Sequence, residues 1–334
     1  MKKAIFLCDK PSKFASVFRA DVTERIKRSA ELDERLYSKA DALSGATDFS
    51  DVQIIFSTWG MPAFTEEEIK RIFPSLECVF YAAGTVQGFA RPFLNCGVRV
   101  FSAWAANAVP VAEYTVAQII LANKGFYAHT RLMAEKRIDE AKALKECYPG
   151  SFGRKIGLIG CGMIGSLVAQ MLKPYALNVL AFDPFLSDER AEKLGVTKVS
   201  LDELFASCGV VSNHLANNEA TKGMLKYEHF SSMPAYATFI NTGRGAQVVE
   251  DDLVRALGER EDLCALLDVT YPEPAELSHP FYTLKNCFMT PHVAGSLCDE
   301  VVRMAEYMCA EYEKYSSGLE CSYEVNMKML ETMA

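Results

Sequence analysis

The stretch Lys155-Ile156-Gly157-Leu158-Ile159-Gly160-Cys161-Gly162-Met163-Ile164-Gly165 decides the fold of this chain. An apolar run typical of a buried strand enters a glycine-rich turn, and apolar residues continue to Leu172 as in a helix. In such a turn Gly160 allows the tight bend, Gly162 lets the backbone approach a pyrophosphate, and Gly165 lets the helix pack closely on the strand. The helix N-terminus offers free N–H groups and a partial positive charge to the phosphates. The stretch therefore predicts a dinucleotide-binding strand, turn and helix.

A carboxylate at the end of the next predicted strand supports the same interpretation. Asp183 lies 18 residues after Gly165, where a carboxylate can accept hydrogen bonds from both ribose hydroxyls of an adenosine. A carboxylate at this position repels a 2′-phosphate, and no Lys or Arg follows until Arg190. The sequence therefore predicts NAD rather than NADP. The alternative is that Asp183 caps a turn before Pro184.

Two series of apolar strands alternate with amphipathic stretches, which indicates an α/β protein with parallel sheets covered on both faces. The first series is Ala4–Cys8, Val52–Phe56, Cys78–Ala82 and Val98–Phe101, with helices predicted over Phe14–Ile26 and Glu66–Ile72. The second series is Lys155–Gly160, Asn178–Asp183, Val210–Leu215, Thr238–Asn241, Leu263–Asp268 and Cys287–Thr290. Long helices are predicted between the two series, over Val109–Lys124 and His129–Glu146.

This order of elements predicts two interleaved domains. Residues 1–104 form the first part of one domain, residues 105–298 form the dinucleotide-binding domain, and residues 299–334 return to the first domain. The return is inferred from an amphipathic helix predicted over Asp299–Ser316, which is too long to be merely a tail. The apolar run Val109–Ala122 contains Glu113 and is shorter than the about 20 residues that cross a bilayer, so no membrane segment is expected.

The composition excludes several classes of protein. The 334 residues carry 35 Lys and Arg against 43 Asp and Glu, a net charge of −8, so the basic surface that binds a phosphate backbone is missing and no nucleic-acid partner is expected. The 11 cysteines form no Cys-x-x-Cys pair and have no histidine at metal-ligand spacing. We therefore expect neither a metal site nor a disulfide framework, and a reducing, cytoplasmic location.

Three further segments each follow a strand of the second series. They are Ile240-Asn241-Thr242-Gly243-Arg244-Gly245, Asp268-Val269-Thr270-Tyr271-Pro272-Glu273-Pro274 and Thr290-Pro291-His292-Val293-Ala294-Gly295. Their side chains should gather at the carboxyl ends of the sheet, where ligands bind. With the glycine turn and the order Arg, Glu, His, the chain resembles the D-isomer-specific 2-hydroxyacid dehydrogenase family over nearly its whole length, including Ala83-Gly84-Thr85 after an early strand and Val111-Ala112-Glu113.

The chemistry of the three side chains agrees with this resemblance. A planar guanidinium such as Arg244 grips a carboxylate bidentately and can polarise a neighbouring keto oxygen. His292 can exchange a proton with the substrate oxygen, as a general acid in reduction and a general base in oxidation. Glu273, hydrogen-bonded to that imidazole, would favour its protonated form and fix its orientation. The triad suits the reduction of a small 2-keto acid by NADH.

The resemblance also implies a fold and a set of ligand contacts. It implies a Rossmann NAD-binding domain inserted into a flavodoxin-like substrate domain, an active cleft between the domains, and a homodimer built on the long helices before Pro149. The residues expected to contact NAD are Gly160, Gly162, Met163, Ile164, Gly165, Asp183, His214, Leu215, Ala216, Thr221, Thr242, Gly243 and Asp268. Those expected to bind the substrate are Ala83, Gly84, Thr85 and Arg244.

Simpler structural roles remain open for several of these residues. Arg244 could be a solvated turn residue between glycines, and Glu273 a rigid surface turn between prolines. His292 could be a satisfied structural histidine, and Asp268 a cap for the turn after its strand. Glu113 is interpreted as a structural link between domains rather than a catalyst.

The chain also departs from the family pattern. Ala216 stands where family members commonly have proline, so a looser cofactor loop remains an alternative. Phosphoglycerate-specific relatives carry basic groups in the loop that is Ser57-Thr58-Trp59-Gly60-Met61-Pro62 here, and this loop has no Lys or Arg. The chain given also ends at Ala334 without the regulatory domain that many phosphoglycerate enzymes append. We therefore expect a substrate that is not a phosphate ester.

Three other functions are considered from the same resemblance. Formate dehydrogenases pair the histidine with glutamine, and Glu273 stands at that position here, which disfavours formate. NAD-sensing corepressors of this fold retain the Arg, Glu and His, so a binding protein remains an alternative to an enzyme. A phosphoglycerate dehydrogenase remains the alternative among the enzymes.

Overall fold

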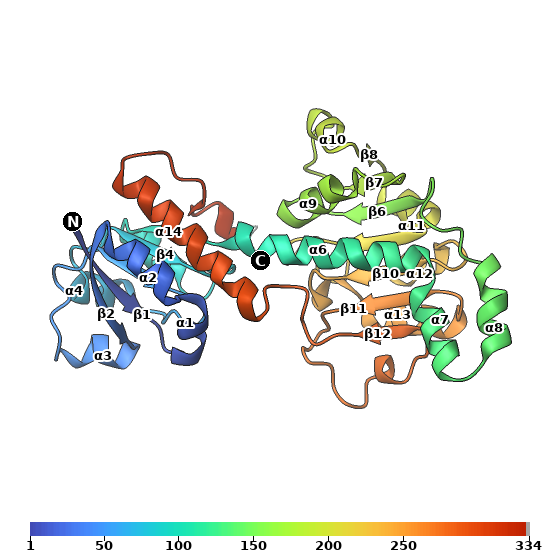
Figure 1. The fold of residues 1–334 in the computed structure, drawn as a ribbon, viewed down its shortest axis with the longest axis horizontal. Coiled ribbons are helices and arrows are strands. Elements are labelled where there is room, and N and C mark those ends of the chain that lie inside the picture. The colour runs from blue at the N-terminus through green and yellow to red at the C-terminus, as the bar shows by residue number, and fades with distance from the viewer. Residues whose placement is uncertain (332–334) are drawn as a thin grey trace. The chain divides into compact units, whose positions relative to one another are not determined.

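The computed structural model describes residues 1–331, which fall into two compact units (Figure 1). Unit 1 is residues 1–107 together with the chain from Ser296 onward, and unit 2 is residues 108–295. The sequence prediction placed these boundaries after residues 104 and 298. The last three residues of the segment predicted to return, 332–334, lie outside the described residues.

Unit 1 is an α/β layer built on a six-stranded sheet in the order β13-β5-β4-β3-β1-β2. Its strands are parallel except β13, which pairs antiparallel with β5. The order 2-1-3-4-5 of its parallel strands is the flavodoxin-like arrangement, as predicted. The elements are β1 (Lys2–Leu7), α1 (Pro11–Val17), α2 (Ala20–Lys27), β2 (Ala30–Tyr37), α3 (Lys39–Ser44), β3 (Ile54–Ser57), α4 (Glu66–Ile72), β4 (Cys78–Tyr81), α5 (Ala90–Asn95), β5 (Arg99–Ser102), η4 (Cys298–Val301), α14 (Val302–Ser316), β13 (Glu324–Val325) and η5 (Met329–Glu331).

Two predictions for unit 1 were wrong. The strand β2 was missed because it lies at the edge of the sheet, where its charged middle is largely exposed and no apolar run marks it. The single helix predicted over Phe14–Ile26 is two helices, since Phe18 and Arg19 leave the helical conformation. Hydrophobic spacing continues across this break because Phe18 still packs into the core.

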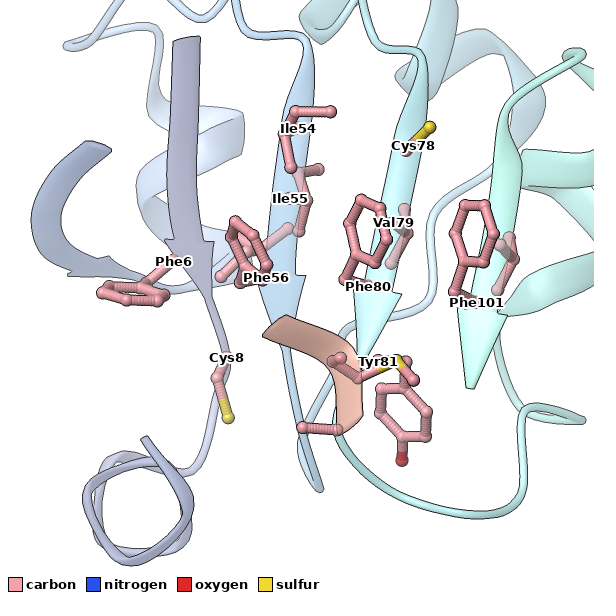
Figure 2. Close-up of a cluster of buried hydrophobic side chains, with 14 of the residues drawn as sticks. Phe6, Cys8, Ile54, Ile55, Phe56, Cys78, Val79, Phe80, Tyr81 and Phe101 are labelled. Atoms are coloured by element: carbon pink, nitrogen blue, oxygen red, sulfur yellow. The ribbon is translucent and has the colours of Figure 1, made fainter. Parts of the chain in front are cut away.

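An aromatic row crosses the sheet of unit 1. Phe56, Phe80 and Phe101 stand on neighbouring strands with their side chains on one face, as Figure 2 shows. The ring centroids of Phe56 and Phe80 are 5.4 Å apart, and those of Phe80 and Phe101 are 4.6 Å apart. Tyr312 of α14 meets Phe80 edge-on at 5.4 Å. Helix α14 therefore covers this face of the sheet, although it follows unit 2 in the sequence.

Unit 2 contains a seven-stranded parallel sheet in the order β12-β11-β10-β9-β6-β7-β8. Counted from β6, the order 3-2-1-4-5-6 is the Rossmann arrangement with one strand added, as predicted. The elements from the unit boundary onward are α6 (Trp104–Asn123), α7 (Phe126–Ala134), α8 (Ile138–Ala143), η1 (Leu144–Glu146), β6 (Lys155–Ile159), α9 (Met163–Leu172), β7 (Asn178–Phe182), α10 (Asp188–Leu194), β8 (Thr197–Lys198), α11 (Leu201–Ser207), β9 (Val210–Asn213), α12 (Tyr227–Ser232), β10 (Thr238–Asn241), η2 (Gly245–Gln247), α13 (Glu250–Glu259), β11 (Cys264–Leu267), η3 (Pro280–Tyr282) and β12 (Cys287–Met289).

The helices before β6 also differ from the prediction. The helix predicted over His129–Glu146 is divided into α7, α8 and η1. The break between α7 and α8 contains Lys136, whose φ of 60° is not helical. Helix α6 begins at Trp104 and is 20 residues long. By length and composition alone α6 could cross a membrane, so the length argument in the sequence analysis was wrong. Buried core helices pass the same test, and half of the apolar window of α6 is buried inside the structure.

Truncation of Phe80 should destabilise unit 1 strongly. We expect Phe80→Ala to lower its free energy of unfolding by about 3–5 kcal/mol, because the cavity would lie between two stacked rings and Tyr312. Phe80→Leu should cost clearly less. Urea denaturation followed by circular dichroism measures both. The matched control is Phe152→Ala, since Phe152 is 92% exposed; equal effects at the two positions would contradict the proposed packing.

Candidate active site

The glycine turn after β6 has the geometry of an anion cradle. Gly160 has φ +87°, and a Cβ there would lie 2.9 Å from the carbonyl oxygen of His214. A Cβ on Gly165 would lie 2.0 Å from the carbonyl oxygen of Gly160, so helix α9 can approach the turn only without a side chain at this position. Apart from its chain neighbours, no atom of residues 1–331 lies within 4 Å of the Cβ position of Gly162, and none of their side chains caps α9 by a hydrogen bond. The N-terminus of α9 therefore faces open space suited to a pyrophosphate.

Asp183 lies beside this turn and is half-buried. Its Oδ2 accepts the N–H of Cys161 at 2.7 Å, and its Oδ1 accepts the N–H of Phe185 at 2.8 Å. The turn-capping role considered for Asp183 is thus present. Each carboxylate oxygen can accept a second hydrogen bond, so a ribose could still bind. The guanidinium of Arg190 donates to the carbonyl oxygen of Cys161 at 2.8 Å and to Oγ of Ser166 at 2.9 Å, which places a cation at the glycine turn.

The loop after β9 lies against the same turn. Burial lowers the pKa of His214 to about 4, so the ring is neutral near neutral pH. Its Nε2 lies 3.0 Å from Oγ of Ser212, whereas its Nδ1 is buried without a hydrogen-bond partner among the described residues. Thr221 donates its hydroxyl to the carbonyl oxygen of Ala216 at 2.7 Å, which fixes the loop that holds Leu215. An orphaned ring nitrogen beside an open glycine cradle fits the presence of a bound dinucleotide.

Arg244 lies after β10 in an extended conformation, and its side chain is partly buried. Its Nη1 donates to the carbonyl oxygen of Gly243 at 2.8 Å. The neighbouring Thr242 is buried, and its Oγ1 lies 3.2 Å from Oγ1 of Thr115 on α6. This arrangement leaves most of the guanidinium donors available to a ligand carboxylate. Arg244 is therefore held by its loop and is not a freely solvated turn residue.

Asp268 is 3% exposed and organises the segment that carries His292. Its Oδ1 accepts the hydroxyl of Thr290 at 2.6 Å and the N–H of Val293 at 2.8 Å, and its Oδ2 accepts the N–H of Ala294 at 2.9 Å. The main-chain N–H of His292 donates to the carbonyl oxygen of Asp268 at 3.0 Å. The capping role considered for Asp268 is therefore present, and one lone pair of Oδ2 remains for a ligand.

The structure brings Glu273 and His292 together. Nδ1 of His292 lies 2.5 Å from Oε1 of Glu273, and the two side chains are 46% and 39% exposed. His292 has a positive φ of 55°, a conformation that residues other than glycine seldom adopt. Glu250, on α13, accepts the N–H of Tyr271 at 2.8 Å and so anchors the segment that carries Glu273. Burial raises the pKa of Glu250 to about 7. Glu250 is a supporting residue that the sequence analysis missed, because nothing in its local sequence marks it as buried.

Ala83, Gly84 and Thr85 follow β4 in unit 1. The carbonyl oxygens of Ala83 and Gly84 accept the hydroxyl of Ser102 at 2.9 and 2.6 Å, which fixes the backbone of this turn. In the same unit, Cβ and Cγ of Lys10 lie against Gly60 of the loop at 57–62. A basic side chain from a different segment thus adjoins the loop that has none of its own. Among residues 1–331 no group of three or more potential metal ligands occurs.

The chain is similar in sequence to known proteins. Residues 116–294 match the family model described as D-isomer specific 2-hydroxyacid dehydrogenase, NAD binding domain. The chain is 31% identical over 282 residues to a formate dehydrogenase of Neurospora crassa, covering 81% of this chain and 75% of that protein. It is 31% identical over 237 residues to a D-3-phosphoglycerate dehydrogenase of Archaeoglobus fulgidus, covering 70% of this chain and 44% of that protein.

A solved structure shares the fold over almost the whole chain. The NAD-complexed D-isomer specific 2-hydroxyacid dehydrogenase of Lactobacillus delbrueckii superposes with a TM-score of 0.77 at 19% identity, covering 97% of this chain and all of that one. The chain spans less than half the length of the phosphoglycerate dehydrogenase that it matches. Because the family model covers more than half of the chain and the formate dehydrogenase is matched over three quarters of its length, this protein belongs to the D-isomer specific 2-hydroxyacid dehydrogenase family and carries that family's NAD-binding domain.

Proposed function

We propose that the protein is an NAD-dependent dehydrogenase that interconverts a small, unphosphorylated 2-keto acid and its D-2-hydroxy acid. The observation that carries the proposal is the 2.5 Å contact between Nδ1 of His292 and Oε1 of Glu273. With Nδ1 engaged by the carboxylate, Nε2 is the ring nitrogen left to exchange a proton with a substrate. Arg244, on the loop after β10 in the same unit, supplies the cation that a substrate carboxylate requires.

Each side chain then has a defined role in reduction. The guanidinium of Arg244 binds the substrate carboxylate and polarises the keto oxygen. NADH, when bound, supplies the hydride. Nε2 of protonated His292 donates a proton to the oxygen that becomes the hydroxyl group, and the reverse reaction returns the proton to Nε2. The carboxylate of Glu273 contacts Nδ1 and so orients the ring. In unit 1 the N–H of Ala83 donates to the carbonyl oxygen of Tyr81 at 2.9 Å, so Gly84 and Thr85 are the residues of this turn whose backbone N–H groups we assign to a substrate.

The location and assembly of the protein are part of the proposal. All 11 cysteines are free thiols, which is typical of a reducing compartment, and we place the protein in the cytoplasm. Large apolar side chains on and near α7 and α8 are exposed in the single chain, with Phe126 at 43%, Met133 at 53% and Ile138 at 47%. A second copy of the chain would cover such a surface, so the active form is a homodimer.

A panel of substrates tests the activity. We expect the purified protein to oxidise NADH with glyoxylate, hydroxypyruvate or a short branched 2-keto acid, and Arg244→Ala to lose both binding and turnover, because one group binds and polarises the substrate. Steady-state assays at 340 nm measure both. Phosphohydroxypyruvate, and formate with NAD, complete the panel. Turnover confined to either of them, or no NADH oxidation with any acid, would contradict the proposed substrate class.

The Glu273→Gln variant tests the contact between Glu273 and His292. The amide keeps the shape of the side chain but loses the carboxylate charge, so Nδ1 of His292 is held by a weaker hydrogen bond and kcat for reduction should fall about 10-fold. His292→Ala removes the proton donor itself and should lose about 10²–10⁴-fold in both directions. Steady-state rates of reduction and oxidation measure both variants. A kcat of Glu273→Gln within about twofold of wild type would mean that Glu273 is only part of a structural turn.

Cofactor choice should follow Asp183. We expect a lower kcat/KM with NADPH than with NADH, because the carboxylate repels a 2′-phosphate. Asp183→Asn should narrow the difference, since Arg190 is already at the glycine turn and could pair with the phosphate. Initial rates at subsaturating cofactor measure the ratio. Equal rates with both cofactors in the wild type would refute the role of Asp183.

A further inference from the structure

Three buried primary amides meet beneath the two loops that carry the proposed site. Asn213 ends β9, Asn241 ends β10, and Gln247 ends η2. Asn213 and Asn241 are directly paired in the parallel register of the two strands. The exposed fractions of the three residues are 0%, 1% and 0%. Buried amides are costly unless their polar atoms find partners, so their contacts show what they hold in place.

The amides bind one another first. Nδ2 of Asn213 donates to Oδ1 of Asn241 at 3.0 Å and to Oε1 of Gln247 at 2.6 Å. These two bonds use both hydrogens of one amide and connect the ends of two strands with the 3₁₀ turn between Arg244 and Val248. The cluster therefore has a fixed geometry before its contacts with the loops are considered.

The amides of Asn241 and Gln247 also bind the backbone around Arg244. Oε1 of Gln247 accepts the N–H of Arg244 at 3.3 Å, and Nδ2 of Asn241 donates to the carbonyl oxygen of Arg244 at 3.1 Å. Oδ1 of Asn241 also accepts the N–H of Gly243 at 3.1 Å. The peptide groups on both sides of Arg244 are thus held by side-chain amides.

The same cluster holds the loop that follows β9. Nε2 of Gln247 donates to the carbonyl oxygens of Leu215 at 2.8 Å and Ala216 at 3.0 Å. Oδ1 of Asn213 accepts the N–H of Leu215 at 3.2 Å. The side chain of Gln247 therefore bridges the two loops, because its oxygen accepts from Arg244 and its nitrogen donates to residues 215 and 216.

We propose that Gln247 and Asn213 are positioning residues that couple the cofactor loop at His214–Ala216 to the backbone of Arg244. The proposal rests on the function proposed above for these two loops. Neither side chain is placed to touch a reacting atom, since each is fully buried and its polar atoms are used by the protein. Their effect on the reaction is exerted through the backbone, so a displaced cluster disturbs cofactor binding and the Arg244 guanidinium together.

The variant Gln247→Glu separates coupling from simple packing. The carboxylate keeps the volume and the acceptor for Asn213 and Arg244, but it loses both donors to the carbonyl oxygens of residues 215 and 216. We expect the Kd for NADH, measured by fluorescence titration, to rise about 10-fold or more. We expect kcat/KM for the best keto acid to fall about 10²-fold, with a lower kcat as well as a higher KM. Gln247→Asn, which is neutral but one methylene too short to bridge the loops, should change both quantities in the same direction.

Asn286→Asp is the matched control. Nδ2 of Asn286 likewise donates to two backbone carbonyl oxygens, those of Leu257 at 3.0 Å and Arg260 at 3.2 Å, but away from both loops. Asn286→Asp should keep the Kd for NADH and the kcat/KM within about twofold of wild type, even where its loss of Tm equals that of the Gln247 variants. NADH affinity requires no turnover, so this arm tests the coupling even if no keto acid of the panel is a substrate.

Two results would overturn the proposal. One is an unchanged Kd for NADH in folded Gln247→Glu and Gln247→Asn. The other is a loss of NADH affinity in proportion to the loss of Tm in Gln247→Glu, Gln247→Asn and Asn286→Asp alike. The cluster would then contribute to the stability of the fold and not to the coupling of the two loops. If Gln247→Glu does not fold, Gln247→Asn decides between these outcomes.

Discussion

Three neighbouring strands of unit 2 end in buried polar side chains, and the site depends on how these groups are satisfied. Asn213 ends β9, Asn241 ends β10, and Asp268 follows β11. These three strands are adjacent in the sheet. A buried amide or carboxylate must find hydrogen-bond partners. At the carboxyl ends of parallel strands the nearest unpaired groups are the N–H and C=O groups of the following loops. Satisfying the three side chains therefore fixes the backbone that carries Arg244 and His292.

The groups assigned to the chemistry differ from the groups that support them. His292 and Glu273 are 46% and 39% exposed, so water screens their charges and the pair contributes little to stability. Asp268 and Gln247 are buried and use their polar atoms on the loops. Buried hydrogen bonds thus hold the loops, while His292 and Glu273 stay exposed enough to reach a ligand. The sequence motifs contain Asp268 but not Gln247, because nothing in the local sequence shows which polar groups the side chain of Gln247 meets.

The parts of the fold that could be predicted are those with a strong local signal. The apolar runs of β4, β6 and β10 were found within a residue of their ends because strands buried on both faces are apolar throughout. Strand β2 has no such run, since it lies at the edge of its sheet and exposes charged side chains. The break at Lys136 could not be predicted because its positive φ comes from a residue that rarely adopts one.

The sequence by itself determined the alternation of buried strands with helices, the glycine turn and the identities of Arg244, Glu273 and His292, because each depends on residue type and spacing along the chain. Only the tertiary structure decided that Glu273 and His292 touch, that Asp183 caps the glycine turn, that Arg190 reaches that turn, and that Gln247 bridges two loops. Each of these contacts joins different elements of the fold. Such contacts depend on strand order and register, which hydrophobic spacing alone does not specify.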